Sequence, residues 1–100
     1  MTQFIKLRWS GYRIQHIARH NITPEEVEEV IFFDKQCFIQ KRVKSKKYPG
    51  SNLYAVFGST LEGRLLMILL LNTSSGYYVP ITARDMNDTE RKYYQKRRRR

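Results

Sequence analysis

The sequence contains one cysteine, Cys37, so no disulfide bond can form within the chain. Independence from disulfides suits a reducing compartment, and we expect a cytoplasmic protein. Long hydrophobic runs are also missing: the longest, Leu65–Leu71, falls far short of the roughly 20 apolar residues of a membrane-spanning helix. Residues 1–20 lack the apolar core of a signal peptide. The sequence therefore predicts a soluble protein without membrane association.

Metal-binding and nucleotide-binding motifs are absent as well. The chain has no glycine-rich phosphate loop, and its histidines and cysteine lack a spacing typical of a metal site. His16 and His20 are four residues apart, but no glutamate lies between them as in the H-E-x-x-H motif. Cys37 lies in a predicted strand with no activating neighbour, which favours a buried apolar role over that of a nucleophile. We predict no metal and no cofactor.

Acidic residues are scarce. Nine Asp and Glu residues against nineteen Lys and Arg residues give a net charge of +10. Residues 96–100 are all basic, so residues 1–95 carry about +5 on their own. This balance favours a polyanionic partner, either a nucleic acid or an acidic protein. Adjacent cations repel one another, so residues 96–100 are predicted to form a disordered tail that adds nonspecific affinity.

The remaining pattern predicts a single α+β domain over residues 1–95. The apolar segment 4–9 predicts an edge strand, and Ser10 and Gly11 then break its pattern. The segment 12–20 predicts a short helix that ends near Asn21, because asparagine tolerates the left-handed backbone typical of helix ends. Thr23, followed by proline and then by Glu26, is typical of a helix N-terminus with a capping box. The second helix should therefore begin after Thr23 and end near residues 33–34.

Four β-segments follow and are joined by short links: 37–43, 53–59, 65–71 and 77–83. Short links favour antiparallel pairing. The apolar segment 65–71 should be central in the sheet, whereas Pro80 places the last strand at an edge or marks a bulge. Asn87 or Asp88 should cap a closing helix. We expect a small antiparallel sheet with two N-terminal helices and one C-terminal helix packed on one face.

Arginines gather near the last strand and the closing helix. Arg84 ends the strand, and Arg91 lies near the first turn of the helix. Antiparallel pairing should bring Arg64, at the start of the neighbouring strand, close to Arg84. Forked guanidinium donors suit phosphate oxygens, so this cluster predicts an anion site. In the alternative interpretation, each arginine forms a surface ion pair with one of the nearby carboxylates, Asp85, Asp88 and Glu90.

Three segments, HIARHNITPEEVEEVIF, GRLLMILLL and ITARDMNDTERKYY, resemble the BrnT-like family of small bacterial toxins. The resemblance extends over roughly Trp9 to Tyr94, and its most specific part is the T-A-R…E-R-x-Y pattern. It implies a RelE-type α+β fold, metal-independent cleavage of RNA and a small antitoxin protein encoded nearby. The chain departs from the family pattern at Ser10, where the family has Asp, at Asn21, where it has Gly, and at Pro80.

The resemblance also implies which residues are functional. Two of them are the strand residues Arg64 and Arg84, and a third is His20 at the junction of the first two helices. The others lie on the closing helix: Glu90, Arg91, Tyr93 and Tyr94. The arginines would hold the phosphate. His20, Glu90, Tyr93 or Tyr94 would transfer protons, with the 2′-hydroxyl of RNA as the nucleophile. Further cations predicted to contact RNA are Arg91, Lys92, Lys46 and Lys47.

These features predict a toxin-like component of a type II toxin–antitoxin system that acts as a metal-independent endoribonuclease. One alternative is a non-catalytic module that binds RNA or an acidic protein through the same basic surface. A third interpretation is a subunit whose apolar sheet face completes a larger complex. The sequence leaves open whether the chain forms a homo-oligomer.

Overall fold

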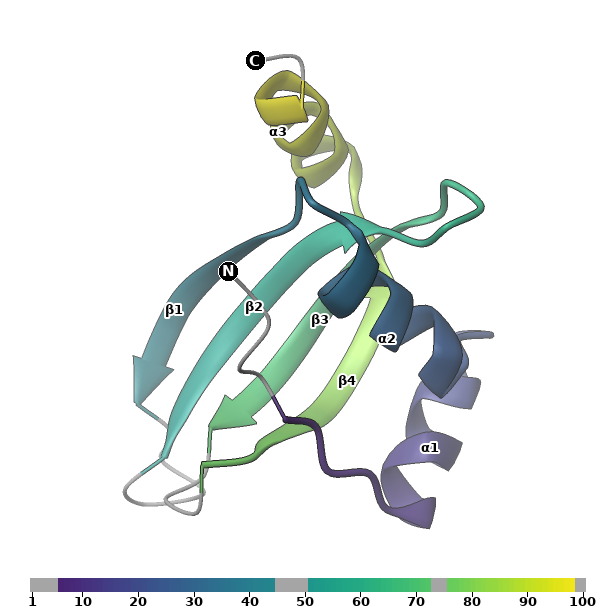
Figure 1. Cartoon of the computed structure of the whole chain (residues 1–100), viewed down its shortest axis with the longest axis vertical. Helices are drawn as coiled ribbons and strands as arrows, with labels where there is room; N and C mark the ends of the chain where they lie inside the picture. Colours follow the sequence, from purple (N-terminus) through teal and green to yellow (C-terminus); the bar gives the residue numbers. More distant parts are fainter. Residues whose placement is uncertain (1–5, 45–50, 73–75, 99–100) are drawn as a thin grey trace.

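The structure, a computed structural model, describes residues 6–44, 51–72 and 76–98. Within these ranges, two helices precede a four-stranded antiparallel sheet and one helix follows it (Figure 1). This arrangement confirms the predicted α+β class. The elements are α1 (Gly11–Ala18), α2 (Pro24–Phe33), β1 (Phe38–Lys44), β2 (Asn52–Ser59), β3 (Leu65–Asn72), β4 (Tyr78–Asp85) and α3 (Asp88–Arg98).

Local signals set the first two helices. Ser10 accepts a hydrogen bond from the backbone N–H of Arg13 and so caps α1, where the sequence indicated only a break. Asn21 has a φ of 59°, the left-handed backbone expected after this helix. The capping box of α2 is confirmed: Thr23 Oγ1 accepts from the Glu26 N–H at 3.2 Å, and Glu26 accepts from the Thr23 N–H at 3.1 Å.

The strands pair in the order β1-β2-β3-β4, so β3 is internal, as predicted, and β4 is an edge strand. Pro80 lies on this edge beside a bulge. Leu69 pairs with Thr82 and Leu70 pairs with Pro80, so Ile81 has no opposite residue. A proline cannot donate a ladder hydrogen bond, and both predicted accommodations of Pro80, the edge and the bulge, are present.

The sheet is covered on both faces, which corrects the expectation that all three helices share one. Helices α1 and α2 pack with alternate strand residues such as Val56 and Ile68. Residues of the opposite parity, Phe57 and Met67, pack with Tyr94 of α3. Because successive strand residues point to opposite faces, α3 lies on the other side of the sheet from α1 and α2.

The expected strand at residues 4–9 is not formed by its described part. Leu7 makes only an isolated parallel bridge with Tyr78, and the chain then leaves the sheet. The indole of Trp9 donates to Glu28 of α2 at 3.2 Å, and Ser10 already caps α1. These two interactions, one with α2 and one at the start of α1, hold the chain against the helices instead of in the sheet. Residues 4 and 5 lie outside the described residues.

Helix α3 begins with a second capping box. Asn87 Oδ1 accepts from the Glu90 N–H at 2.8 Å, and Glu90 accepts from the Asn87 N–H at 2.9 Å. The helix continues to Arg98, past the predicted start of the basic tail, and the Arg97 guanidinium lies 4.4 Å from the centre of the Phe38 ring. This cation–π contact stabilises the last turn. Among the described residues, no helix is long and apolar enough to cross a membrane.

Candidate functional site

Strand alternation separates the predicted site residues. Arg84 pairs across the sheet with Met67 and so shares the face of α3, whereas Asp85 pairs with Leu66 on the face of α1 and α2. The bulge at Ile81 determines which face each of these two side chains occupies. Without the extra residue, Arg84 would point to the face of α1 and α2, and Asp85 would point to the face of α3. Arg64 and His20 therefore lie with Asp85, apart from Arg84 and its neighbours.

Arg64 is a structural tie rather than an open anion site. Its guanidinium donates to Asp85 at 2.8 and 3.2 Å and to the Glu26 carboxylate at 3.3 Å. It also donates to the backbone carbonyls of Asn21 at 2.7 Å and His20 at 3.1 Å. A guanidinium has five N–H donors, and these bonds occupy all of them. Arg64 thus joins the α1–α2 junction to the end of β4.

The electrostatics of this tie agree with its geometry. Hydrogen bonding to Asp85 raises the pKa of Arg64, although burial opposes the rise. The same hydrogen bond holds the pKa of Asp85 below its ordinary value of 3.8, with a smaller contribution from the nearby His20. Both charged forms are stabilised. A phosphate could reach Arg64 only by displacing one of these acceptors.

Arg84 forms a forked ion pair with Glu90, a residue in the first turn of α3. Its Nη1 and Nη2 donate to the two carboxylate oxygens at 2.8 and 3.0 Å, and Nη1 also donates to the Asp85 carbonyl at 3.1 Å. Hydrogen bonding to Glu90 raises the pKa of Arg84, against the effect of burial. The Arg84 side chain is 39% exposed and that of Glu90 only 15%. Among the described residues, Nε–H and one Nη2–H of Arg84 have no acceptor.

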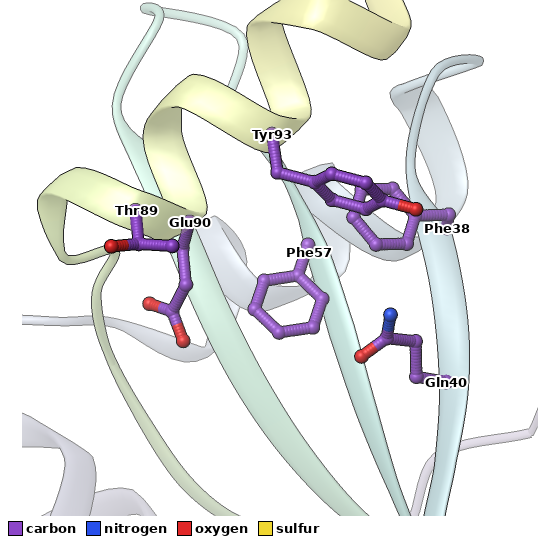
Figure 2. A pocket seen from close by; sticks show the side chains of 6 residues that line it. All are labelled: Phe38, Gln40, Phe57, Thr89, Glu90 and Tyr93. Carbon is purple, nitrogen blue, oxygen red and sulfur yellow. The ribbon is translucent and has the colours of Figure 1, made fainter.

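An aromatic pocket lies beside this ion pair (Figure 2). Its volume is about 160 Å³, and it is lined by Phe38, Gln40, Phe57, Thr89, Glu90 and Tyr93. The Phe38 ring stacks on Phe57 with centroids 5.1 Å apart, and Tyr93 meets Phe38 edge-on at 5.4 Å. Tyr93 is 47% exposed, so its ring forms an outer wall. The pocket can take a flat aromatic group beside a guanidinium–carboxylate pair.

The other predicted residues of α3 have different environments. Arg91 pairs with Asp88 and donates to the Met86 carbonyl, so it holds the start of the helix. The three arginines proposed for an anion site are thus all ion-paired, as in the alternative interpretation. Lys92 is exposed. Tyr94 is buried, which removes it from any surface reaction.

Of the remaining predicted residues, His20 lies away from the pocket. His20 is exposed, and its ring centroid is 6.4 Å from that of His16 on the α1 side of the molecule. Lys46 and Lys47 lie outside the described residues. Of the predicted catalytic residues, the structure therefore brings together Arg84, Glu90 and Tyr93.

Sequence reasoning missed the aromatic lining and a partly buried polar junction. Asp34, after α2, accepts from the Ser59 N–H at 2.8 Å and from the Tyr94 hydroxyl at 2.7 Å. This junction leaves no room beside Gly58, where an added Cβ would lie 2.8 Å from Asp34 Oδ2. The alternation of Phe38 with its strand neighbours was the available signal for the lining, because it places that ring opposite α1 and α2.

Cys37 is buried, as expected for a small apolar residue, and burial together with the nearby Asp34 raises the pKa of its thiol to about 11. A thiol in this state is a poor nucleophile at neutral pH. Among the described residues, no group of three His, Cys, Asp or Glu side chains could hold a metal ion. No protein-family model matches the chain, and no curated protein matches it.

Proposed function

We propose that this protein is a toxin-like endoribonuclease that binds single-stranded RNA at the aromatic pocket and cleaves it without a metal ion. The observation that supports the proposal is the forked Arg84–Glu90 pair beside the rings of Phe38, Phe57 and Tyr93. Rings stack on nucleobases, and a guanidinium binds phosphate. The net charge of +10 favours the approach of RNA, and the resemblance to BrnT-like toxins favours the biological role.

The proposed reaction uses the 2′-hydroxyl of RNA as the nucleophile. The substrate phosphate takes over donors of Arg84 from Glu90, and the released carboxylate accepts the 2′-hydroxyl proton. The O2′–P bond forms while the P–O5′ bond breaks, and the leaving 5′-oxygen takes a proton from the Tyr93 hydroxyl. Arg84 stabilises the negative charge on the phosphorane. The products are a 2′,3′-cyclic phosphate and a 5′-hydroxyl end.

The test is cleavage of RNA in the presence of EDTA by the parent chain and two variants. Arg84→Ala should lose phosphate binding, and Glu90→Gln should slow cleavage by about 10²–10⁴-fold because it removes the general base. Arg19→Ala removes the same charge as Arg84→Ala, but at the exposed C-cap position of α1, and should leave cleavage unchanged. Equal activity of the parent and Arg84→Ala would remove this site from the proposal.

The toxin role has a separate test. Induced expression should arrest bacterial growth, and co-expression of the protein from the neighbouring reading frame should relieve the arrest. Growth arrest that persists in Glu90→Gln would separate toxicity from RNA cleavage.

A second candidate function is a non-catalytic RNA-binding module. It is favoured by one specific observation: Arg64, Arg84 and Arg91 are all engaged by carboxylates, and Arg64 has no donor left. Such a module would bind RNA with strong salt dependence and leave it intact. Binding of RNA by the parent chain with no cleaved product would establish this second function in place of the first.

A further inference from the structure

A second, polar pocket lies close to the aromatic one. It has a volume of about 290 Å³ and is lined by Lys35, Gln36, Cys37 and Arg97. Three of these residues belong to the turn between α2 and β1, and Arg97 comes from the last turn of α3. Two cations from elements far apart in the sequence therefore meet at one hollow.

The charges of this pocket are not neutralised locally. Among the described residues, neither Lys35 nor Arg97 forms an ion pair, in contrast to Arg64, Arg84 and Arg91. Asp34, the nearest carboxylate in the sequence, accepts hydrogen bonds from Ser59, Tyr94 and the backbone N–H of Gln36. These hydrogen bonds already stabilise the negative charge of Asp34. The positive charges of Lys35 and Arg97 therefore have no carboxylate partner among the described residues of the pocket.

Arg97 connects the two pockets. Its guanidinium carbon lies 4.4 Å from the centre of the Phe38 ring and 5.9 Å from that of Tyr93, and both rings line the aromatic pocket. A guanidinium that lies over a ring keeps its N–H donors at the edge of the plane. Arg97 is therefore held in place by the wall of one pocket while its donors are available to an anion in the other.

We propose that the polar pocket is a subsite for a backbone phosphate of single-stranded RNA, next to the nucleotide whose base occupies the aromatic pocket. The proposal rests on the proposed binding of RNA and adds its path: the strand runs from the Arg84–Glu90 pair past Tyr93 to Lys35 and Arg97. The ligand class is a phosphodiester, bound by one guanidinium and one ammonium group. The basic residues 96–100 were predicted to add only nonspecific affinity for a polyanion. At one of them, Arg97, we now propose a specific phosphate contact.

The experiment measures the affinity of a fluorescently labelled oligouridylate for the parent chain and for Lys35→Gln/Arg97→Gln over a range of salt concentrations. To exclude cleavage, the 2′-hydroxyls are replaced by 2′-O-methyl groups. The double variant should bind on the order of tenfold more weakly. The slope of log K against log salt should fall by about 0.7, the value for one phosphate contact on a single strand.

The matched control is Lys6→Gln/Arg19→Gln, which removes the same charge from exposed side chains. Lys6 lies beside the start of β4, at the far end from α3, and Arg19 ends α1 on the opposite face of the sheet. The control should keep the parental slope. Lys35→Gln/Arg97→Lys should bind more tightly than Lys35→Gln/Arg97→Gln but less tightly than the parent chain. Lysine keeps the positive charge but lacks the planar guanidinium that stacks on Phe38.

Three results would overturn the inference. An equal loss of slope in both double variants would show a diffuse charge effect, and an unchanged slope in Lys35→Gln/Arg97→Gln would show that the pocket does not contact RNA. In both cases the proposed function would stand. Failure of the parent chain to bind the oligonucleotide would overturn the subsite and the proposed function together. Lys35→Gln alone, at an exposed position outside the helices, keeps the test valid if the Arg97 variants unfold.

Discussion

Arg64→Ala should destabilise the folded chain by about 3 kcal/mol. The Asp85 side chain is 59% exposed, so its pair with Arg64 contributes less than about 1 kcal/mol. The bonds to Glu26 and to the carbonyls of His20 and Asn21 contribute about 1 kcal/mol each, because these acceptors remain partly accessible to water. For a domain of this size, 3 kcal/mol corresponds to a fall in Tm of about 12–24 °C.

The assay is urea unfolding followed by far-ultraviolet circular dichroism. The midpoint of Arg64→Ala should fall while the m-value stays constant, since the loss is one of stability and not of compactness. Arg91→Ala is the matched control: its partner Asp88 is 83% exposed and lies on the same helix, and its one carbonyl bond, to Met86, contributes about 1 kcal/mol, so the cost should stay below about 2 kcal/mol. Equal destabilisation by the two variants would refute the view that Arg64 is a tertiary tie.

Two further predictions concern pH and packing. The pKa of Asp85 is lowered in the folded state, so the pair with Arg64 stabilises the fold above the unfolded pKa and is lost as the pH falls through the folded pKa. The Tm difference between the parent and Asp85→Asn should therefore shrink between about pH 5 and pH 2, and a constant difference would contradict the assignment. Gly58→Ala should cost about 1–3 kcal/mol, because the added methyl group would lie within 2.9 Å of three atoms. Gly11→Ala, with nothing within 4 Å, should leave the urea midpoint unchanged or slightly raised, and equal effects of the two substitutions would contradict the packing argument.

Local features of the fold could be predicted from the sequence. Thr23 and Glu26 form the expected capping box, Asn21 has the expected left-handed backbone, and Pro80 lies on the expected edge strand. Each depends on interactions among neighbouring residues, which the sequence displays directly. The segment Leu65–Leu71 could also be predicted to be internal. Successive side chains of a strand point to opposite faces, and because all of them are apolar here, both faces of this strand must be buried.

The site was predictable only in part. Antiparallel pairing was expected to bring Arg64 close to Arg84. Arg64 does reach the end of β4, but it lies with Asp85 on the other face of the sheet from Arg84. The pairing also did not show that the guanidinium would bind two backbone carbonyls there. Those carbonyls come from the α1–α2 junction, more than 40 residues away in the sequence. The aromatic pocket also needed the tertiary structure, because Phe38 and Tyr93 meet only when α3 crosses the sheet.

By itself, the sequence determined the class of the fold, the ends of most elements and the basic character of the surface. Only the tertiary structure decided which arginine lies in the candidate site. The physical reason is the bulge beside Pro80: one extra residue in β4 reverses the alternation and places Arg84 on the face of α3 and its neighbour Asp85 on the other. The sequence could mark a bulge at this proline but not its effect on the side chains that follow, because that effect depends on the register with β3.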